Sequence, residues 1–284
     1  MPDFNWEHEA ERELKRVPFF LRPMVRRKVE EMVSKKQKRV VSLADFKEAE
    51  SRFRQVSSGK SEAELKNMIP VENRPGAQMV IIEVCQNKLT SCPNVLIDTD
   101  EWKNAVESWI HRNEISEKLR KRIRGEKIYF HNKFKISISG CPNSCSRPQI
   151  SDIGIVGTVQ PYFSQSNCSH CGACARVCPD FALTVEELPP VFNAQACQGC
   201  KKCFEACKNG CITLSLPCCR ILMGGKLGRH PHLAEIVTVA RKPEELISIL
   251  DSAIEDYLIN GSEEERFADF WIRNFSKNRI YQNK

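Results

Sequence analysis

The sequence lacks any apolar run that approaches the roughly 20 residues a membrane-spanning helix needs, which excludes membrane spans. Its first residues, Met-Pro-Asp-Phe-Asn-Trp-Glu, also lack the basic and then apolar order of an export signal. We therefore expect a cytoplasmic protein without membrane insertion. In that reducing compartment the 15 cysteines of this 284-residue chain cannot be a disulfide framework, so their number indicates metal ligation or redox chemistry.

Charge is unevenly spread along the chain, whose net charge is +7. Residues 1–60 hold 15 Lys and Arg against 10 Asp and Glu, whereas the rest of the chain holds 28 against 26. A basic helical region can bind nucleic acid, and the segment Arg26-Arg27-Lys28 is the one candidate for a recognition helix. A solvated helical face is the commoner outcome of such a charge run, so we do not expect a nucleic-acid partner.

The N-terminal region, residues 1–56, alternates apolar and charged residues at helical spacing. The pattern predicts two short amphipathic helices that are broken by Pro18 and Pro23. A third helix is predicted over 43–53, with Ser42 as its cap. We expect a small helical domain here.

The middle of the chain has the pattern of a sheet domain. After a polar linker at 57–77, residues 78–84 are a β-rich apolar run, residues 100–122 have a helical period, and residues 129–138 alternate as a strand. Each of the two strands leads into a cysteine pair, and ligands on loops after strands suit a cluster held at one edge of a sheet. The pairs are Cys85 with Cys92, and Cys141 with Cys145.

Residues 161–214 hold the most specific pattern. Two runs of four cysteines follow the spacing C-x2-C-x2-C-x3-C at a constant offset of 29 residues. The similarity extends to Leu183-Thr184 and Ile212-Thr213, which indicates an internal duplication. The first run is Cys168, Cys171, Cys174 and Cys178, and the second run is Cys197, Cys200, Cys203 and Cys207.

This pair of runs resembles the two-cluster bacterial ferredoxins, which bind two 4Fe-4S clusters. Three thiolates on one tight loop can reach three corners of a cluster, so the fourth ligand has to come from elsewhere. In that family the fourth cysteine of each run serves the other cluster, which assigns Cys207 to the first run's cluster and Cys178 to the second run's. Zinc also binds C-x2-C pairs, but zinc sites do not require two four-cysteine runs with the same spacing.

Three cysteines lie outside these patterns. Cys211 takes the place of Ala182 in the duplication, at the start of a strand, which favours a buried structural thiol. Cys218 and Cys219 are adjacent, and a vicinal pair cannot easily hold one cluster. We expect all three to be structural.

The chain also resembles the cluster-binding half of sulfite and nitrite reductases, through ISGCPNSC at 138–145, DIGIVG at 152–157, and the segments 224–231 and 265–270. A ferredoxin module inserted after the C-x3-C pair resembles the C subunit of anaerobic sulfite reductases in particular. In that family two cysteine pairs hold a 4Fe-4S cluster, and the last cysteine bridges to the iron of sirohaem. The resemblance implies a third cluster on Cys85, Cys92, Cys141 and Cys145, with Cys145 as the bridging ligand.

The family normally carries a ferredoxin-like half before the first cysteine pair, whose arginines help to clamp the sirohaem carboxylates and the anionic substrate. Residues 4–53 stand in its place, and they resemble the small helical C-terminal domain of light-independent protochlorophyllide reductase subunits through RVPFFLR at 16–22. The segment between Cys85 and Cys92 is one residue longer than usual, so we expect this loop to bulge.

Sirohaem bears many carboxylates, and burying them is costly unless basic side chains pair with them. The resemblance implies that Lys226 and Arg229, beside His230 and His232, neutralise substrate oxygens and relay protons. For the histidines a surface position is the commoner outcome. The candidate cofactor-binding residues near the matching motifs are Lys133, Lys135, Arg147, Lys226 and Arg229.

Besides a redox-sensing nucleic-acid binder that uses the basic helices, two functions are compatible with this pattern. The first is an iron-sulfur oxidoreductase in which electrons pass through the ferredoxin clusters to the third cluster and across Cys145 to sirohaem, for reduction of sulfite or nitrite. The second is a sirohaem-free electron-transfer subunit with three 4Fe-4S clusters that serves a partner enzyme. We expect an electron-donor protein or ferredoxin as a partner, and an additional subunit or a homo-oligomer. The lysines around the second run either dock that donor or are merely solvated; they are Lys201, Lys202 and Lys208.

The C-terminal region predicts a helix from Pro243 to Gly261 and another that starts at Ser262 and packs on the sheet. We expect an α+β fold in three parts. These are a helical domain at 1–56, a sulfite-reductase-like half domain of mixed sheet and helices at 78–160 and 215–284, and a two-cluster ferredoxin module at 161–214.

Overall fold

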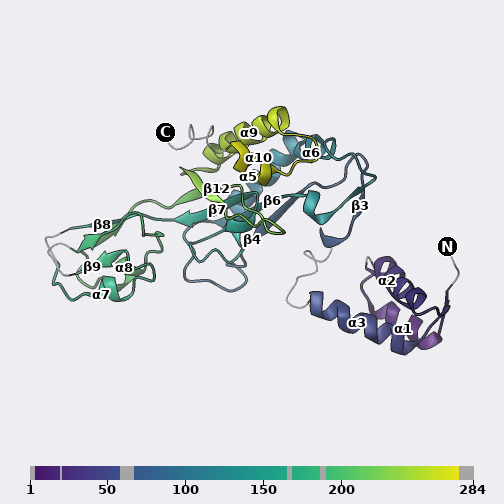
Figure 1. Ribbon diagram of the computed structural model, residues 1–284. Coiled ribbons are helices and arrows are strands. Elements are labelled where there is room, and N and C mark those ends of the chain that lie inside the picture. Colours follow the sequence, from purple (N-terminus) through teal and green to yellow (C-terminus); the bar gives the residue numbers. More distant parts are fainter. Residues whose placement is uncertain (1–3, 20, 58–66, 165–167, 186–189, 275–284) are drawn as a thin grey trace. The chain divides into compact units, whose positions relative to one another are not determined.

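The chain forms two compact units (Figure 1). The first contains Met1–Glu72 and Lys127–Phe130, and the second contains Asn73–Glu126 and His131–Lys284. None of the described helices is long and apolar enough to cross a membrane. The computed structural model describes residues 4–19, 21–57, 67–164, 168–185 and 190–274.

Among the described residues of the first unit, α1, α2 and α3 are the three helices that the sequence predicts. Pro23 lies in the first turn of the second helix instead of breaking it, because proline is tolerated where the backbone N–H would have no helical partner. The break between the first two helices therefore falls before Arg22. The elements are β1 (Asn5–Trp6), α1 (His8–Arg16), α2 (Arg22–Lys35), β2 (Val40–Val41), α3 (Leu43–Ser57), β3 (Val71–Glu72) and β5 (Lys127–Ile128).

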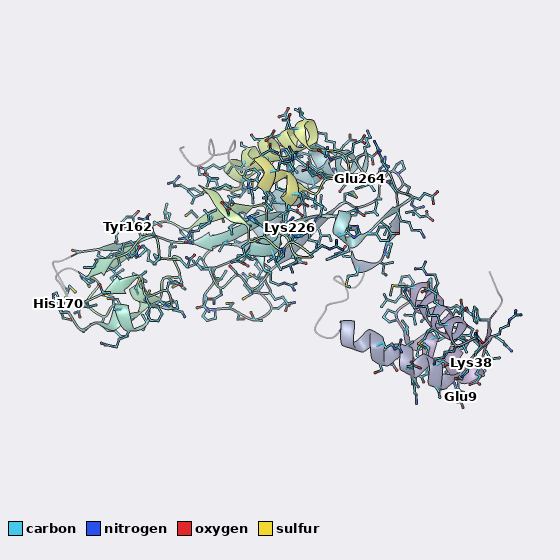
Figure 2. All side chains as sticks on the ribbon, viewed as in Figure 1. Glu9, Lys38, Tyr162, His170, Lys226 and Glu264 are labelled. Carbon is cyan, nitrogen blue, oxygen red and sulfur yellow. The ribbon has the colours of Figure 1, made fainter. Side chains whose placement is uncertain are left out.

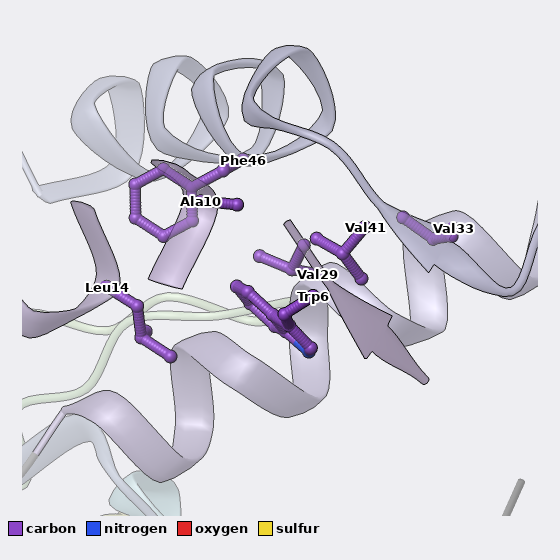
Figure 3. Close-up of a cluster of buried hydrophobic side chains, with 7 residues drawn as sticks. All are labelled: Trp6, Ala10, Leu14, Val29, Val33, Val41 and Phe46. Carbon is purple, nitrogen blue, oxygen red and sulfur yellow. The ribbon is translucent and has the colours of Figure 1, made fainter. Parts of the chain in front are cut away.

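A single apolar cluster holds these helices together (Figure 3). Trp6 packs edge-on against Phe46, with 6.5 Å between the ring centroids, and its Nε1 donates a hydrogen bond to Glu30 at 3.0 Å. Burying a large apolar side chain contributes about 1.5–3 kcal/mol, so this small core is enough to order short helices. Its members are Trp6, Ala10, Leu14, Val29, Val33, Val41 and Phe46.

Ser42 and Asp45 cap α3 reciprocally, which confirms the predicted cap. The N–H of Asp45 donates to Ser42 Oγ at 3.3 Å, and the N–H of Ser42 donates to Asp45 Oδ2 at 3.3 Å. Lys36 Nζ also donates to Asp45 Oδ1 at 2.8 Å. The hydrogen bond from Lys36, followed by that from Ser42, lowers the pKa of the buried Asp45 from 3.8 to about 2.

Acid should therefore destabilise the first unit. Because the pKa of Asp45 is lower in the folded protein, its contribution to the free energy of unfolding is present above about pH 4 and is lost as the pH falls through about 2. We expect Asp45→Asn to cost about 1–2 kcal/mol at pH 7 and almost nothing near pH 2. Hydrogen exchange of N-terminal peptides measures this, with Glu48→Gln, the more exposed partner of Lys36, as the control. A pH-independent cost of Asp45→Asn would contradict the linkage.

The second unit contains a five-stranded mixed sheet in the order β13-β12-β7-β6-β4. Strands β4, β6 and β7 are parallel, whereas β12 is antiparallel to both β7 and β13. This sheet with its helices confirms the α+β class. The strands are β4 (Val80–Val84), β6 (Phe134–Ser139), β7 (Ile153–Thr158), β12 (Cys218–Met223) and β13 (Glu235–Ala240).

Two of the predicted elements differ in the structure. The strand predicted over 129–138 begins only at Phe134, because Phe130–Asn132 form a 3-10 turn. The helix predicted over 100–122 is two helices, since the left-handed backbone of Glu114, with φ +50°, interrupts it. The helices of this unit outside the ferredoxin module are α5 (Thr99–Arg112), α6 (Ile115–Arg120), α9 (Pro243–Asn260) and α10 (Phe267–Asn274).

The last helix starts later than the sequence predicts. The N–H of Ser262 donates to the carboxylate of Glu265 at 2.8 Å, and Glu264 has a φ of +57°, so Ser262–Glu265 is a turn and α10 begins at Phe267. As predicted, α10 packs on the sheet, since the ring of Phe267 lies 5.1 Å from that of Phe134 in β6.

The predicted ferredoxin module, residues 161–214, leaves the sheet after β7 and returns at β12 (Figure 1). Its strands pair crosswise: β8 pairs with β11, and β9 pairs with β10. The rings of Phe163 and Phe192, 29 residues apart like the cysteine runs, lie 5.1 Å from each other. The elements are β8 (Pro161–Phe163), α7 (Ala173–Arg176), β9 (Leu183–Thr184), β10 (Val191–Phe192), α8 (Lys202–Ala206) and β11 (Ile212–Leu214).

Candidate functional site

The carboxyl ends of β4 and β6 bring the first two cysteines of the sheet domain together. The two strands are adjacent and parallel, so the residues that follow them meet at one edge of the sheet. The N–H of Cys85 donates to Ile138 O at 3.0 Å, and the N–H of Gly140 donates to Cys85 Sγ at 3.2 Å. Cys141 is therefore placed beside Cys85.

The other two cysteines of this group lie close to the same point. Burial raises the pKa of the Cys141 thiol, and the charges of Cys92, Cys145 and Cys85 raise it further, which places all four within electrostatic range of one another. Cys141 is buried and Cys145 is exposed. Iron ligation by this group stays a prediction.

The loop between Cys85 and Cys92 takes up its additional residue in a wide turn. The N–H of Cys92 donates to Asn87 O at 2.9 Å, and Ser91 has a left-handed φ of +47°. The Asn87 side chain anchors this turn, because its Oδ1 accepts a hydrogen bond from Thr99 Oγ1 at 2.9 Å. The bulge expected from the spacing is thus a turn tied to the start of α5.

A buried network of serine hydroxyls holds the segment that carries Cys145. Ser146 Oγ donates to Ile138 O at 2.8 Å, and Ser137 Oγ donates to Ser146 O at 2.6 Å. Ser139 Oγ lies 2.7 Å from Ser146 Oγ. These serines were not predicted from the sequence, although their alternation along β6 is a signal for polar groups on one sheet face.

The cysteines of the predicted ferredoxin module fall into two groups of electrostatic neighbours. Burial raises the pKa of the Cys174 thiol, and the nearby thiols of Cys168 and Cys171 raise it further. Burial also raises the pKa of the Cys203 thiol to about 11, and its charged neighbours include one cysteine of the first run. These neighbours are Cys197, Cys200 and Cys178.

The donor sets suit iron-sulfur clusters. A buried thiol with a raised pKa resists ionisation, so the positive charge of iron has to stabilise the thiolate. Backbone N–H groups point at the sulfurs, from Ala182 to Cys178 at 3.3 Å and from Gly199 to Cys197 at 3.3 Å. Among the residues that the structure describes, no group of three or more Cys, His, Asp and Glu side chains has the geometry to hold one metal ion.

Cys211 lies beside Cys207, the last cysteine of the second run, and within electrostatic range of Cys168 of the first run. Its Sγ is 3.1 Å from that of Cys207, and this contact, with burial, raises the pKa of Cys211 to about 12, which keeps the thiol neutral. We expect Cys211→Ala to retain the iron content, because Ala182 fills the same position in the duplication. Iron analysis of anaerobically purified protein checks this, with Cys207→Ala as the control that lowers the iron. Equal losses in the two variants would make Cys211 a ligand.

Lys226 and Arg229 lie on the turn between β12 and β13. Met223 at the end of β12 pairs with Ile153, the first residue of β7, so this turn is at the edge opposite to the ends of β4 and β6. Lys226 is paired with Asp269 of α10, and Arg229 is exposed. The turn nevertheless packs on the segment that follows Cys145, because a Cβ on Gly225 would lie 2.6 Å from Gln149 O, and Gln149 Nε2 donates to Ser144 Oγ at 2.8 Å. Figure 2 shows Lys226 on the sheet domain, and the role of the two basic side chains stays a prediction.

The remaining predicted cofactor-binding residues lie on or near β6. Burial lowers the pKa of both Lys133 and Lys135, and the N–H of Lys135 donates to the fully buried Asp152 at 2.9 Å. Arg147 pairs with Glu83 at 3.6 Å. Lys133 and Asp152 line a small cavity of about 30 Å³. Acidic neighbours thus already balance part of this basic charge.

Arg220 of β12 is a further residue that was not predicted from the sequence. Its guanidinium donates to Cys197 O and to Gln198 Oε1, each at 2.7 Å. An arginine in the middle of an otherwise apolar strand was the available signal. Lys201, expected to dock a donor or to be solvated, instead donates to Pro93 O at 2.9 Å.

The chain matches two protein families. Residues 76–274 match the nitrite and sulphite reductase 4Fe-4S domain, and residues 6–50 match the proto-chlorophyllide reductase 57 kD subunit. Both resemblances inferred from the sequence are thereby confirmed.

Individual relatives cover shorter segments. The chain is 59% identical over 46 residues to the coenzyme F420-dependent sulfite reductase of Methanocaldococcus jannaschii, which is 16% of this chain and 7% of that protein. It is 36% identical over 62 residues to the C subunit of the anaerobic sulfite reductase of Salmonella typhimurium, 21% of this chain and 18% of that protein. The chain thus matches less than a fifth of the length of these relatives.

Among solved structures, dissimilatory sulfite reductase I aligns with 72% of this chain and 52% of its own, at 17% identity and a TM-score of 0.44. Since the match to the first family extends over residues 76–274, from β4 to α10, it includes the sheet, the ferredoxin module and every cysteine of the protein. The chain belongs to the nitrite and sulphite reductase 4Fe-4S domain family.

Proposed function

We propose that this protein is an iron-sulfur oxidoreductase of the sulfite and nitrite reductase type, which receives electrons in its ferredoxin module and delivers them to a 4Fe-4S centre on the sheet domain. The observation that carries the proposal is the gathering of cysteines at the ends of β4 and β6, in the same unit as the two cysteine runs. Family membership supports the reaction type.

The chain contributes thiolates and the groups that surround them. Each 4Fe-4S cluster supplies one-electron redox chemistry, with a potential set by hydrogen bonds to sulfur, local charge and exposure. The N–H of Gly140 stabilises negative charge on Cys85 Sγ, and the N–H of Gly199 does the same at Cys197 Sγ. The exposure of Cys145 leaves that sulfur accessible to a further group.

Sirohaem is the further group that this exposed thiol and the family favour. Its carboxylates need basic partners, but Lys226 is paired with Asp269 and Arg147 with Glu83. The described residues of the second unit therefore fit sirohaem only in part. Basic residues from elsewhere, such as a second subunit, would have to complete the pocket. A sirohaem-free subunit that passes electrons to a partner enzyme is the second candidate.

An absorption spectrum with iron analysis of anaerobically purified protein tests both candidates. Three 4Fe-4S clusters give about 12 irons per chain, and sirohaem adds one more, to about 13. A sirohaem spectrum with the higher value supports the reductase, and about 12 irons without that spectrum supports the role in electron transfer alone. Colourless protein, or about 8 irons, would contradict the proposal of three clusters.

A further inference from the structure

The second cysteine run is attached to the edge of the sheet through its backbone. The N–H of Val159 donates to Gly199 O at 3.1 Å, and Thr158 Oγ1 donates to Gln198 O at 3.1 Å. Gly199 has a φ of +72°, and a Cβ there would lie 2.1 Å from Thr158 Oγ1. The run therefore packs directly on the chain where β7 ends.

Two basic side chains extend this attachment. Arg220, on the neighbouring strand β12, donates hydrogen bonds to Cys197 O and to Gln198 Oε1. Lys201, whose side chain is 21% exposed, donates to Pro93 O at 2.9 Å and pairs with Glu205 at 3.1 Å. Pro93 directly follows Cys92, so Lys201 joins the second run to a loop of the sheet domain's cysteine group.

The backbone at Lys201 indicates that this side chain has a specific role. Lys201 has a φ of +62°, a conformation that favours glycine, and its counterpart 29 residues earlier is Gly172, with a φ of +68°. The same backbone geometry thus carries a glycine in one repeat and a lysine in the other. Only the lysine repeat reaches the loop that carries Cys92.

The first run is held by residues of the ferredoxin module itself. Arg176 donates to Cys171 O at 2.8 Å, and Asn209 donates to Ser169 Oγ at 2.7 Å. The residue Cys171 is exposed. The first run therefore presents a cysteine to solvent.

We propose that Lys201 is a positioning residue that holds the second cysteine run against the Cys92 loop, so that the second run, and not the first, is the electron-transfer neighbour of the sheet-domain cysteines. This inference rests on the proposed function. In each transfer, the donor cluster loses one electron and is oxidised, and the neighbouring acceptor cluster gains that electron and is reduced. No bond is formed or broken. A low-potential one-electron carrier protein then supplies electrons at the first run.

Electron paramagnetic resonance of the dithionite-reduced full chain tests the order of the clusters. Cys171→Ala removes the first run's cluster, and the two clusters left should show spin-spin interaction with each other. Cys200→Ala removes the second run's cluster, and the two clusters left should lack that interaction. Interaction in Cys200→Ala but not in Cys171→Ala would overturn the proposal.

Lys201→Gly tests the positioning role. Glycine suits the backbone at this position, so the variant should fold and keep the iron content of its parent. In the Cys171→Ala background, Lys201→Gly should weaken the spin-spin interaction without abolishing it, since the bonds from Val159, Thr158 and Arg220 remain. Lys201→Arg should keep the interaction at its parental strength, and the neighbouring Lys202→Met should leave it unchanged. An unchanged interaction in Lys201→Gly, or loss of iron, would overturn the positioning role. Fewer than about 12 irons in the unmutated protein would instead contradict the proposed function.

Discussion

Replacing Cys178 together with Cys200 is expected to impair one cluster, whereas replacing Cys178 together with Cys171 is expected to impair two. Cys178 belongs to the first run in sequence, but its thiol lies within electrostatic range of Cys203 and Cys197. The first double variant should therefore retain about 8 of about 12 irons and the second about 4, at four per cluster.

Iron analysis and Mössbauer spectroscopy of anaerobically purified protein measure the number of intact clusters. The adjacent cysteines Cys218 and Cys219, which are expected to be structural, offer a matched control. The double variant Cys218→Ala with Cys219→Ala should retain all of the iron. If Cys178 instead served the first run, the order of the two double variants would be reversed. That outcome would refute the exchange of the fourth ligand.

Gly157→Ala is expected to remove the cluster of the sheet domain while sparing those of the ferredoxin module. A Cβ at Gly157 would lie 2.5 Å from Gly140 O and 2.9 Å from Ile97 Cγ1. Gly140 O accepts the N–H of Leu96 at 2.8 Å, and Gly140 precedes Cys141, so the loops of both cysteine pairs would be displaced. Overpacking of this kind costs about 1–3 kcal/mol.

The expected result is a loss of about 4 irons per chain and of the corresponding reduced signal in electron paramagnetic resonance. Gly76→Ala is the control, because a Cβ there meets nothing within 4 Å while the φ of +84° still imposes backbone strain. If Gly157→Ala retained all of its iron, the two loops would tolerate displacement. The close packing at Gly157 would then not be required for cluster binding.

Local signals account for what could be predicted of the fold. The cap formed by Ser42 and the strand that leads to Cys85 depend on neighbours in sequence, and both are present. The errors arose where a tertiary contact or a backbone conformation overrode the periodicity. The left-handed Glu114 divides one predicted helix, and the turn held by Glu265 delays α10.

The positions of the candidate basic residues depend on long-range contacts that a motif does not describe. Lys226 and Arg229 match the family in sequence, but the position of their turn depends on which end of β7 pairs with the end of β12. A motif says nothing about strand direction in a mixed sheet. Strand pairing places this turn beside the first residue of β7, and the close approach of Gly225 to Gln149 O places it against the segment that follows Cys145.

The order of residues alone determined the family, the duplicated cysteine runs and the pairs at the ends of two strands, because thiol spacing and strand alternation are local properties. The tertiary structure alone decided which cysteine run meets the sheet, since this depends on contacts such as that of Lys201 with Pro93, 108 residues apart. No local pattern encodes such a contact, because it joins residues that are distant in sequence and exists only once the chain has folded.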